Sequence, residues 1–208
     1  MSLIDIENVS FEYECGKEVL KDVSLHFGEH DSIGLIGENG VGKSTLLKIL
    51  VGLNPGFSGS VKVDGLPVEK RNLATIREKI GYVFQDSDSQ LFMMTAYDDI
   101  AFVPRNYGLS EDEVEKWVEH AMKMTGIEHL RDKQIYKMSG GEKKLVSIAT
   151  VLSMEPEIIL MDEPSNSLDP RNRRALINIL NSYEGLKIIA SHDLDMILDT
   201  CETAVLLS

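Results

Sequence analysis

Hydrophobic residues occupy every second position in two stretches near the N-terminus: Val9, Phe11, Tyr13, Val23, Leu25 and Phe27. A period of two places successive side chains on opposite faces of a strand, so that one face is apolar. Strands with one solvated face usually pair antiparallel. The pattern therefore predicts an antiparallel sheet in the N-terminal third of the chain, with a turn at Gly28.

A different pattern begins at residue 32. The segment SIGLIG at 32–37 is apolar without interruption and ends in glycine, which is typical of a strand buried on both faces. The apolar residues after it recur at helical spacing up to Gly52. Further strands are predicted at 61–65, 80–84, 158–160 and 187–190. Buried strands that alternate with helices predict a mainly parallel core sheet.

The middle of the chain is predicted to be helical. Ser110 and Glu113 have the spacing of a capping box, which would open a helix that runs to about Thr125. No buried strand is predicted in this region. We therefore expect an α/β fold that forms a single domain over 1–208, with a helical lobe inserted at about 86–150.

Composition narrows the class of protein. The chain has 208 residues, of which 43% are hydrophobic, and this is ordinary for a compact folded protein. Its net charge of −13 argues against nucleic-acid binding, which depends on clustered Lys and Arg. Because no apolar run approaches a bilayer span and no signal segment is evident, we expect a cytoplasmic protein without direct membrane insertion. Cys15 and Cys201 are isolated, which fits a reducing compartment without disulfides.

The strongest chemical signal is GENGVGKST at 37–45, which lies between a predicted strand and a predicted helix. It has the pattern G-x-x-x-x-G-K-[ST] of a phosphate-binding loop, in which backbone N–H groups converge on an anion. Lys43 would reach the outer phosphates, and Ser44 would offer a hydroxyl to Mg²⁺. The predicted phosphate-binding residues are Gly37, Asn39, Gly40, Gly42, Lys43, Ser44 and Thr45. The alternative is a glycine-rich turn before an ordinary helix.

A pair of acids follows the predicted strand at 158–160. Asp162 stands at the end of the strand, where open α/β sheets bind ligands, and a carboxylate suits Mg²⁺. Glu163 would polarise the attacking water, although it also fits a solvated turn before Pro164. A GTPase would carry a guanine-reading Asn-Lys-x-Asp motif after a late strand, and the sequence has none.

The stretch KMSGGEKK at 137–144 contains a second glycine pair at a predicted helix start. Ser139 and Glu142 have the spacing of a capping box. A cap does not explain Gly140 and Gly141, because each glycine in a helix costs up to about 1 kcal/mol relative to alanine. The two lysines that follow also oppose the positive end of the helix. An anion at this helix end would explain both features, and we expect it to be the γ-phosphate held by a second subunit of a two-fold dimer.

Together these motifs resemble those of the nucleotide-binding subunits of ABC transporters, in the same order and over nearly the whole chain. SGGEKK resembles their signature motif, Leu-Ser-Gly-Gly-Gln, and SNSLDP at 165–170 resembles their D-loop. VFQD supplies a Q-loop glutamine, Gln85, and ASHDL a switch histidine, His192. Tyr13 matches the aromatic residue that stacks on adenine, although it also fits a core-facing strand position beside Phe11.

The resemblance implies a P-loop NTPase fold and a role for each matching residue. The implied catalytic residues are Glu163, His192 and Gln85. The implied Mg²⁺ ligands are Ser44, Gln85 and Asp162. Outside the phosphate loop, the implied ATP-binding residues are Tyr13, Ser139, Gly140, Gly141 and Asp169.

The resemblance also implies a mechanism, in which ATP is hydrolysed between two ATPase subunits arranged head to tail beneath a transmembrane permease. The second subunit would be an identical copy or a paralogue. Segment 90–110 resembles the corresponding part of cobalt, nickel and vitamin importer ATPases of the energy-coupling-factor type, which favours import and a location on the inner face of the membrane.

Two other classes stay open. One is a soluble ABC ATPase of DNA repair or the ribosome, although the short stretch between Gln85 and Ser139 leaves no room for a coiled-coil arm. The other is a regulatory module that binds ATP without turnover, which Glu163 and His192 argue against.

The sequence departs from the family pattern near the signature motif. Met138 and Glu142 replace the usual leucine and glutamine, and Leu145 stands where many relatives have arginine. A carboxylate at position 142 would repel a bound polyanion if it turned inward. We expect Glu142 to fold back onto the Ser139 backbone as a cap instead.

Overall fold

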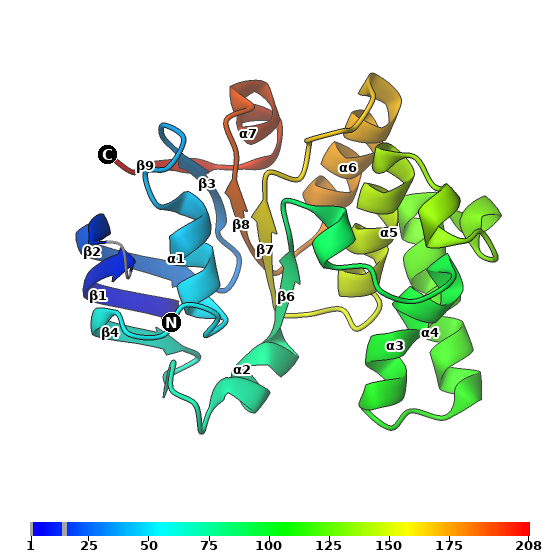
Figure 1. The fold of residues 1–208 in the computed structure, drawn as a ribbon, viewed down its shortest axis with the longest axis horizontal. Helices are drawn as coiled ribbons and strands as arrows, with labels where there is room; N and C mark the ends of the chain where they lie inside the picture. The colour runs from blue at the N-terminus through cyan, green and yellow to red at the C-terminus, as the bar shows by residue number, and fades with distance from the viewer. Residues whose placement is uncertain (1, 14–15) are drawn as a thin grey trace. The chain divides into compact units, whose positions relative to one another are not determined.

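The computed structural model of the chain describes residues 2–13 and 16–208 (Figure 1). Cys15 lies outside the described residues, and Cys201 is a free thiol. The chain divides into two compact units. The first comprises Met1–Tyr82, Glu157–Asp162 and Glu184–Ser208, and the second comprises Val83–Pro156 and Glu163–Tyr183.

The first unit contains the predicted antiparallel sheet. Strand β1 (Ser2–Tyr13) pairs with β2 (Lys17–Gly28) and β4 (Ser58–Val63), and β4 also pairs with β5 (Leu66–Pro67). All these pairs are antiparallel, so the prediction from the alternating pattern is confirmed.

The alternation changes phase within β1. Ile4 and Ile6 are buried, and so are Val9 and Phe11 two positions out of step. A register shift lies between Ile6 and Val9, and Asn8 has a φ of 51°. An irregularity of this kind re-aims the side chains that follow, so both apolar pairs face the core.

The first unit also contains a five-stranded sheet. In order across it, the strands are β6 (Ile80–Val83), β7 (Ile158–Asp162), β8 (Leu186–Ala190), β3 (Ser32–Ile36) and β9 (Thr203–Leu206). The pairs from β7 to β9 are parallel, which confirms the predicted parallel core. Every residue of β7 and β8 is buried, in agreement with their uninterrupted apolar sequences.

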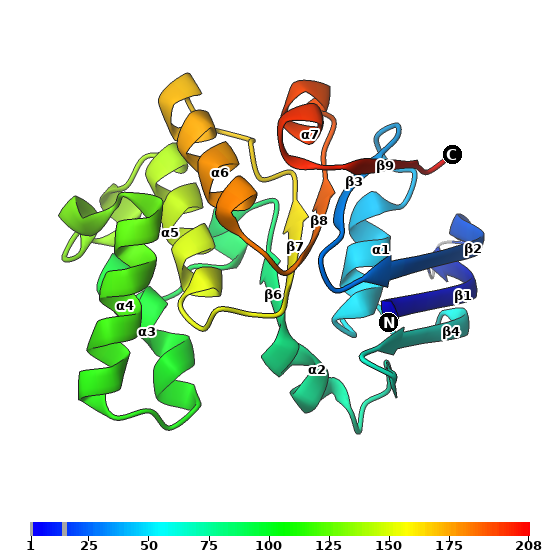
Figure 2. The ribbon, with the colours of Figure 1, turned by 180° about the vertical axis from the view of Figure 1, so that it is seen from behind.

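The helices of this unit are α1 (Lys43–Leu50), α2 (Leu73–Lys79) and α7 (Leu194–Thr200). Helix α1 lies between the antiparallel sheet and β3 in both ribbon views (Figure 1, Figure 2). Its Leu46 and Leu47 belong to the same buried apolar cluster as Ile4 and Leu35. Burial of a leucine or isoleucine stabilises the fold by about 1.5 to 3 kcal/mol, so this cluster fixes the helix that follows the phosphate loop.

The second unit is helical. Its α-helices are α3 (Ala96–Asn106), α4 (Glu111–Thr125), α5 (Gly140–Leu152) and α6 (Pro170–Ser182). The predicted capping box at Ser110 and Glu113 is present, and Gly126 ends α4 in the left-handed conformation. The unit includes the stretch expected to form a lobe and, in addition, Glu163–Tyr183. None of the helices in the described part of the chain has the length and apolar character required to cross a bilayer.

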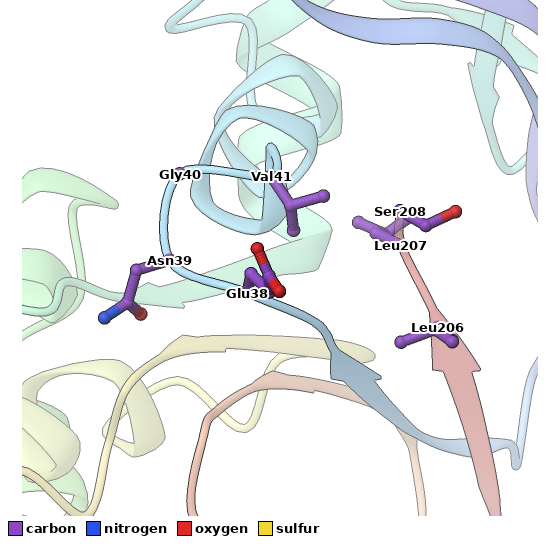
Figure 3. A pocket seen from close by; sticks show the side chains of 7 residues that line it. All are labelled: Glu38, Asn39, Gly40, Val41, Leu206, Leu207 and Ser208. Carbon is purple, nitrogen blue, oxygen red and sulfur yellow. The ribbon is translucent and has the colours of Figure 1, made fainter.

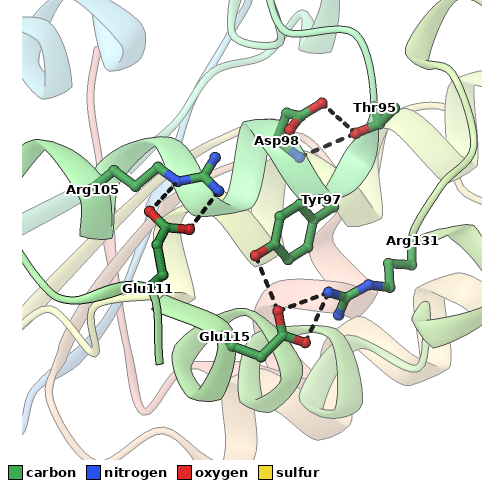
Figure 4. A network of polar contacts seen from close by, with 7 residues as sticks. All are labelled: Thr95, Tyr97, Asp98, Arg105, Glu111, Glu115 and Arg131. Carbon is green, nitrogen blue, oxygen red and sulfur yellow. Dashed lines mark hydrogen bonds and ion pairs between the residues drawn. The ribbon is translucent and has the colours of Figure 1, made fainter. Parts of the chain in front are cut away.

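A polar network joins α3 to α4 (Figure 4). The Tyr97 hydroxyl donates to Glu115 at 3.0 Å, and Arg131 reaches the same carboxylate at 2.8 Å while lying over the Tyr97 ring. Arg105 and Glu111 form a two-pronged ion pair at 3.0 and 2.8 Å. Paired hydrogen bonds between guanidinium and carboxylate fix geometry better than a single contact, so the connection between these helices is held in one arrangement.

Candidate functional site

The candidate site of the first unit starts from three neighbouring strand ends. Leu35 of β3, Ala190 of β8 and Asp162 of β7 are register partners in one row across the sheet. The phosphate loop follows β3, and His192 is exposed just beyond β8. Because parallel strands deliver their carboxyl ends to one edge, the topology gathers these predicted residues at the edge where such sheets bind ligands.

Glycines shape the loop between β3 and α1. Gly40 and Gly42 have φ values of 84° and 111°, in the region that disfavours residues with a Cβ atom. A Cβ at Gly42 would also lie 2.9 Å from the Val19 carbonyl oxygen and 2.7 Å from Leu20. Helix α1 begins at the next residue, Lys43, so its N-terminus opens directly into the loop.

Lys43 is buried inside the loop that it follows. Its ammonium donates to the carbonyl oxygens of Gly37 at 2.7 Å and Glu38 at 3.1 Å. A buried ammonium needs such acceptors, and anionic phosphate oxygens bind it more strongly than neutral carbonyls do. The position fits the predicted contact with the outer phosphates.

Ser44 and Asp162 meet although they are far apart in the sequence. The Ser44 hydroxyl donates to Asp162 Oδ1 at 2.8 Å, and the Asp162 side chain is only 3% exposed. The described residues contain no cluster of three or more His, Cys, Asp or Glu that could hold a metal by itself. One hydroxyl and one carboxylate, completed by phosphate oxygens and water, are the donor set that Mg²⁺ takes with nucleotides, so these residues fit Mg²⁺.

The sequence analysis did not identify Tyr82 of β6 as part of this site. Its hydroxyl contacts Asp162 Oδ2 at 3.5 Å, the long limit of a hydrogen bond. Burial and the neighbouring carboxylate raise the pKa of Tyr82, so its hydroxyl stays protonated. Both oxygens of Asp162 therefore face hydroxyl groups. Only the pairing of β6 with β7 would have revealed this contact.

Tyr13 occupies a position between the two interpretations of the sequence. It packs edge to face against Phe11, with ring centroids 5.0 Å apart, yet it is 39% exposed. Its hydroxyl lies 3.0 Å from Thr45 Oγ1, in the first turn of α1. An aromatic ring held at the start of α1 remains a candidate for stacking on a base.

Glu163, the proposed base, stands in the second unit and has an unusual backbone. Its φ is 47°, a conformation rare for residues other than glycine, and the side chain is only 6% exposed. Its carbonyl accepts a hydrogen bond from Asn166 at 3.2 Å, which closes a turn. Strain of this kind is typical of residues held for function.

The helix start at Ser139 contains the predicted cap. Glu142 accepts a hydrogen bond from the Ser139 amide at 2.8 Å, and the Ser139 hydroxyl accepts one from the Glu142 amide at 3.3 Å. Lys133 also binds Glu142 at 2.7 Å. The expectation that Glu142 folds back onto Ser139 is confirmed, and the cap leaves the amides of Gly140 and Gly141 available for an anion.

Two supporting arguments about this helix start were wrong. Lys143 pairs with Asp88 at 2.5 Å, and buried Lys144 donates to backbone carbonyls, so neither lysine requires an anion at the helix tip. A Cβ at Gly141 would lie 3.3 Å from the Ser167 carbonyl oxygen, closer than most such contacts. Close packing thus gives a second reason for glycine at this position.

The remaining predicted residues have simple environments. Gln85 follows β6 in the second unit, and its carbonyl accepts from Lys144. Asp169 caps α6 by accepting from the Asn172 amide at 2.9 Å. Its side chain is therefore already used in holding a helix.

A pocket of about 550 Å³ borders the other side of the phosphate loop (Figure 3). Its lining residues are Glu38, Asn39, Gly40, Val41, Leu206, Leu207 and Ser208. Asn39 points away from the last three residues in this view. Because Lys43, Ser44 and Asp162 do not line the pocket, it is separate from the cluster that fits a phosphate and a metal ion.

Comparison with known proteins agrees with this geometry. The sequence profile of the ABC transporter family matches residues 20–166. The energy-coupling factor transporter ATP-binding protein EcfA of Carboxydothermus hydrogenoformans is 41% identical over 208 residues, with 99% of this chain and 77% of that protein covered. Relatives from other organisms, at 40% to 42% identity, carry only the broader description of ABC transporter ATP-binding protein.

Two solved structures are also similar. CbiO1 of Clostridium perfringens, part of the ABC transporter complex cbiONQ, has a TM-score of 0.88 and 36% identity, covering 100% of this chain and 85% of that one. The ATP-binding cassette MJ0796, a dimer in a post-hydrolysis state bound to ADP and Pi, has a TM-score of 0.90 and 27% identity, covering 99% and 94%. The chain described here is therefore a member of the ABC transporter family of ATP-binding proteins, and it is an ATPase.

Proposed function

We propose that this ATPase binds ATP with Mg²⁺ at the phosphate loop of its first unit. The observation that carries the proposal is the hydrogen bond between Ser44 and Asp162, directly after the buried ammonium of Lys43. Lys43 would bind the outer phosphates, and Ser44 and Asp162 would hold the metal ion through oxygen atoms. Mg²⁺, when bound, neutralises charge on the phosphates. Tyr13 would stack on the adenine.

Hydrolysis would depend on three further side chains. Glu163 would orient and polarise the attacking water, His192 would contact the γ-phosphate, and Gln85 would contact both the metal ion and the water. The strained backbone and low exposure of Glu163 support its part in this assignment. We further propose that residues 1–208 act as one ABC ATPase domain with an inserted helical lobe.

The active form would be a head-to-tail dimer with a second ABC ATPase subunit, either a copy of this chain or a paralogue. Ser139, Gly140, Gly141 and Asp169 of each subunit would complete the ATP site of the other. The exposed Ser139 and the two amides that its cap leaves available support this arrangement. MJ0796, a structural relative, forms a dimer bound to ADP and Pi.

The dimer would drive import of a metal ion or vitamin through a transmembrane permease, from the cytoplasmic face of the membrane. The similarity to EcfA and to CbiO1 of the cbiONQ complex supports this choice. Purification of the tagged protein from its native membranes tests it. Recovery of a membrane permease is expected. Recovery on ribosomes or DNA would favour the soluble ATPase class instead.

A mixing experiment tests the shared sites. Lys43→Ala and Ser139→Arg should each abolish hydrolysis in a homodimer, because each disables both composite sites. In a mixed dimer, one site combines both defects and the other has none. An equal mixture should therefore recover up to about a quarter of the wild-type rate, since half of the dimers are mixed and each has one intact site. Activity no higher than that of the parental variants would reject the head-to-tail arrangement.

A further inference from the structure

Two side chains of the second unit converge on the peptide that precedes Gln85. The Lys144 ammonium donates to the carbonyl oxygens of Phe84 at 2.9 Å and Gln85 at 2.7 Å. From the other direction, Gln90 Oε1 accepts from the Phe84 amide at 3.1 Å. We call Lys144 and Gln90 the Phe84 clamp, because together they bind both polar groups of Phe84.

The clamp is fastened to helix α5. Lys144 belongs to the helix, and Gln90 Nε2 donates to the Ser147 carbonyl and to Thr150 Oγ1, both at 2.8 Å. Every polar atom of the Gln90 side chain thus has a partner. A fully satisfied network of this kind holds a single arrangement better than isolated contacts do.

Lys144 is an unusual residue for its position. It is 2% exposed and has the largest side chain among the fully buried residues, and its neighbours Leu145 and Val146 are buried apolar residues. An apolar side chain would avoid the cost of burying an ammonium group. Packing alone therefore does not explain this lysine, whereas its two bonds to the Gln85 segment do.

The same helix begins with the turn that the proposed function assigns to the partner's phosphate. Ser139 is the N-cap of α5, and Lys144 lies little more than one turn further along. The clamp therefore makes the backbone of Gln85 and the turn Ser139–Gly141 parts of one rigid element.

We infer that Lys144 and Gln90 are positioning residues for hydrolysis. They act through Gln85, whose backbone they hold on α5, so the Gln85 side chain takes its catalytic position only together with the Ser139–Gly141 turn. This inference rests on the proposed role of Gln85. It goes beyond that role by naming the residues that make Gln85 and the turn move as a unit.

The test measures steady-state ATPase kinetics of Lys144→Met, which removes the donor and keeps an unbranched side chain. The value of kcat should fall by about tenfold while the affinity for ATP stays within about twofold, because small displacements of a catalytic group affect mainly the chemical step. Gln90→Leu should act in the same direction and serves if Lys144→Met does not fold. Lys143→Met is the matched control, since it removes a neighbouring charge of the same helix whose partner is Asp88, and its kcat should be unchanged.

The decisive measurement is a double-mutant comparison. In a Gln85→Ala background, Lys144→Met should cause no further loss of kcat, because the side chain that it positions is gone. An equal further loss in that background would overturn the clamp inference, and so would a similar loss in Lys143→Met. If Gln85→Ala alone leaves hydrolysis unchanged, the proposed role of Gln85 fails, and the inference fails with it for a distinguishable reason.

Hydrogen exchange gives a readout that does not depend on activity. The Phe84 amide should exchange at least about tenfold faster in Gln90→Leu than in the wild type, because it loses its acceptor. Unchanged protection of this amide in the folded variant would show that Gln90 does not hold the segment and would contradict the inference.

Discussion

The residues that would contact the phosphates and metal ion already have partners within the protein. Lys43 donates to two loop carbonyls, and Ser44 donates to Asp162. Nucleotide binding therefore exchanges hydrogen bonds, and each exchange has a small net free energy unless the new acceptor is charged. This favours a triphosphate with a cation over neutral ligands of the same size.

Asp162→Asn tests the metal role. The substitution keeps the shape of the side chain and an oxygen that can accept from Ser44, but it removes the negative charge that a hard cation prefers. The Mg²⁺ concentration that supports half-maximal hydrolysis should rise by about tenfold or more. Binding of a fluorescent ATP analogue in EDTA should change little. Asp162 would lose its assigned role if the Mg²⁺ dependence were unchanged.

At the scale of single residues, sequence reasoning identified motifs better than partners. The glycine-rich loop and Ser139 are visible because their spacing is local. The contact of Tyr82 with Asp162 and the burial of Lys144 depend on segments far apart in the chain, and no local spacing encodes them. The two lysines after Glu142 were misinterpreted for the same reason.

Helix α5 depends on its cap at the element scale. Hydrogen bonds from Lys133 and from the Ser139 amide hold the pKa of Glu142 below its usual value of 4.5. An acid with a lowered pKa in the folded state adds stability above its unfolded pKa, and the gain is lost as the pH falls through the folded value. The contribution of Glu142 is therefore present at neutral pH and disappears below about pH 4.5.

Glu142→Gln should consequently destabilise the protein by up to about 1 kcal/mol at neutral pH, because the ion pair with Lys133 is lost while the amide can still cap Ser139. The difference from the wild type should shrink as the pH is lowered through and below 4.5. Urea unfolding at a series of pH values measures it, with Glu128→Gln as a surface control. A difference independent of pH would contradict the assignment.

The start of helix α3 holds an exposed apolar segment. Buried Asp99 accepts from the amides of Phe92 at 3.2 Å and Met93 at 3.1 Å, while the Phe92 and Met94 side chains are 64% and 68% exposed. Burial raises the pKa of Asp99, although the two amides oppose this shift. The carboxylate thus tolerates burial in order to shape this segment.

Asp99→Ala should lower the free energy of unfolding by about 1 to 3 kcal/mol, because it leaves two amides without their acceptor. Faster hydrogen exchange at Phe92 and Met93 should accompany the loss. Asp98→Ala, which removes only the partner of the Thr95 hydroxyl, is the matched control and should cost less. Equal losses in the two variants would show that the amides of Phe92 and Met93 do not depend on Asp99.

Elements with a strong pattern were predicted, and those without one were missed. Strands β3, β7 and β8 and helix α4 follow from apolar runs, periodicity and a cap. Helix α3 contains Pro104, which weakens its pattern, and β9 is short and mostly exposed, so its sequence does not distinguish it from a loop. Only pairing with β3 makes it a strand.

The dimer is tested at the scale of the whole molecule. Glu163→Gln should reduce hydrolysis by about a hundredfold or more, because general base catalysis contributes at least that factor. Bound ATP would then persist, and the variant should sediment as a dimer with ATP and Mg²⁺ but as a monomer with ADP. Addition of Ser139→Arg to the same chain should abolish the dimer. A monomer at saturating ATP would reject the proposed mechanism.

The order of strands around β3 has a consequence for biogenesis. This strand leads into the phosphate loop, yet both of its neighbours, β8 and β9, come from the last segments of the printed sequence. A ribosome delivers β1, β2 and β4 early, and these can pair at once, whereas β3 must wait for distant partners. The capacity to capture ATP therefore arises late in synthesis, and it marks a chain that has finished folding.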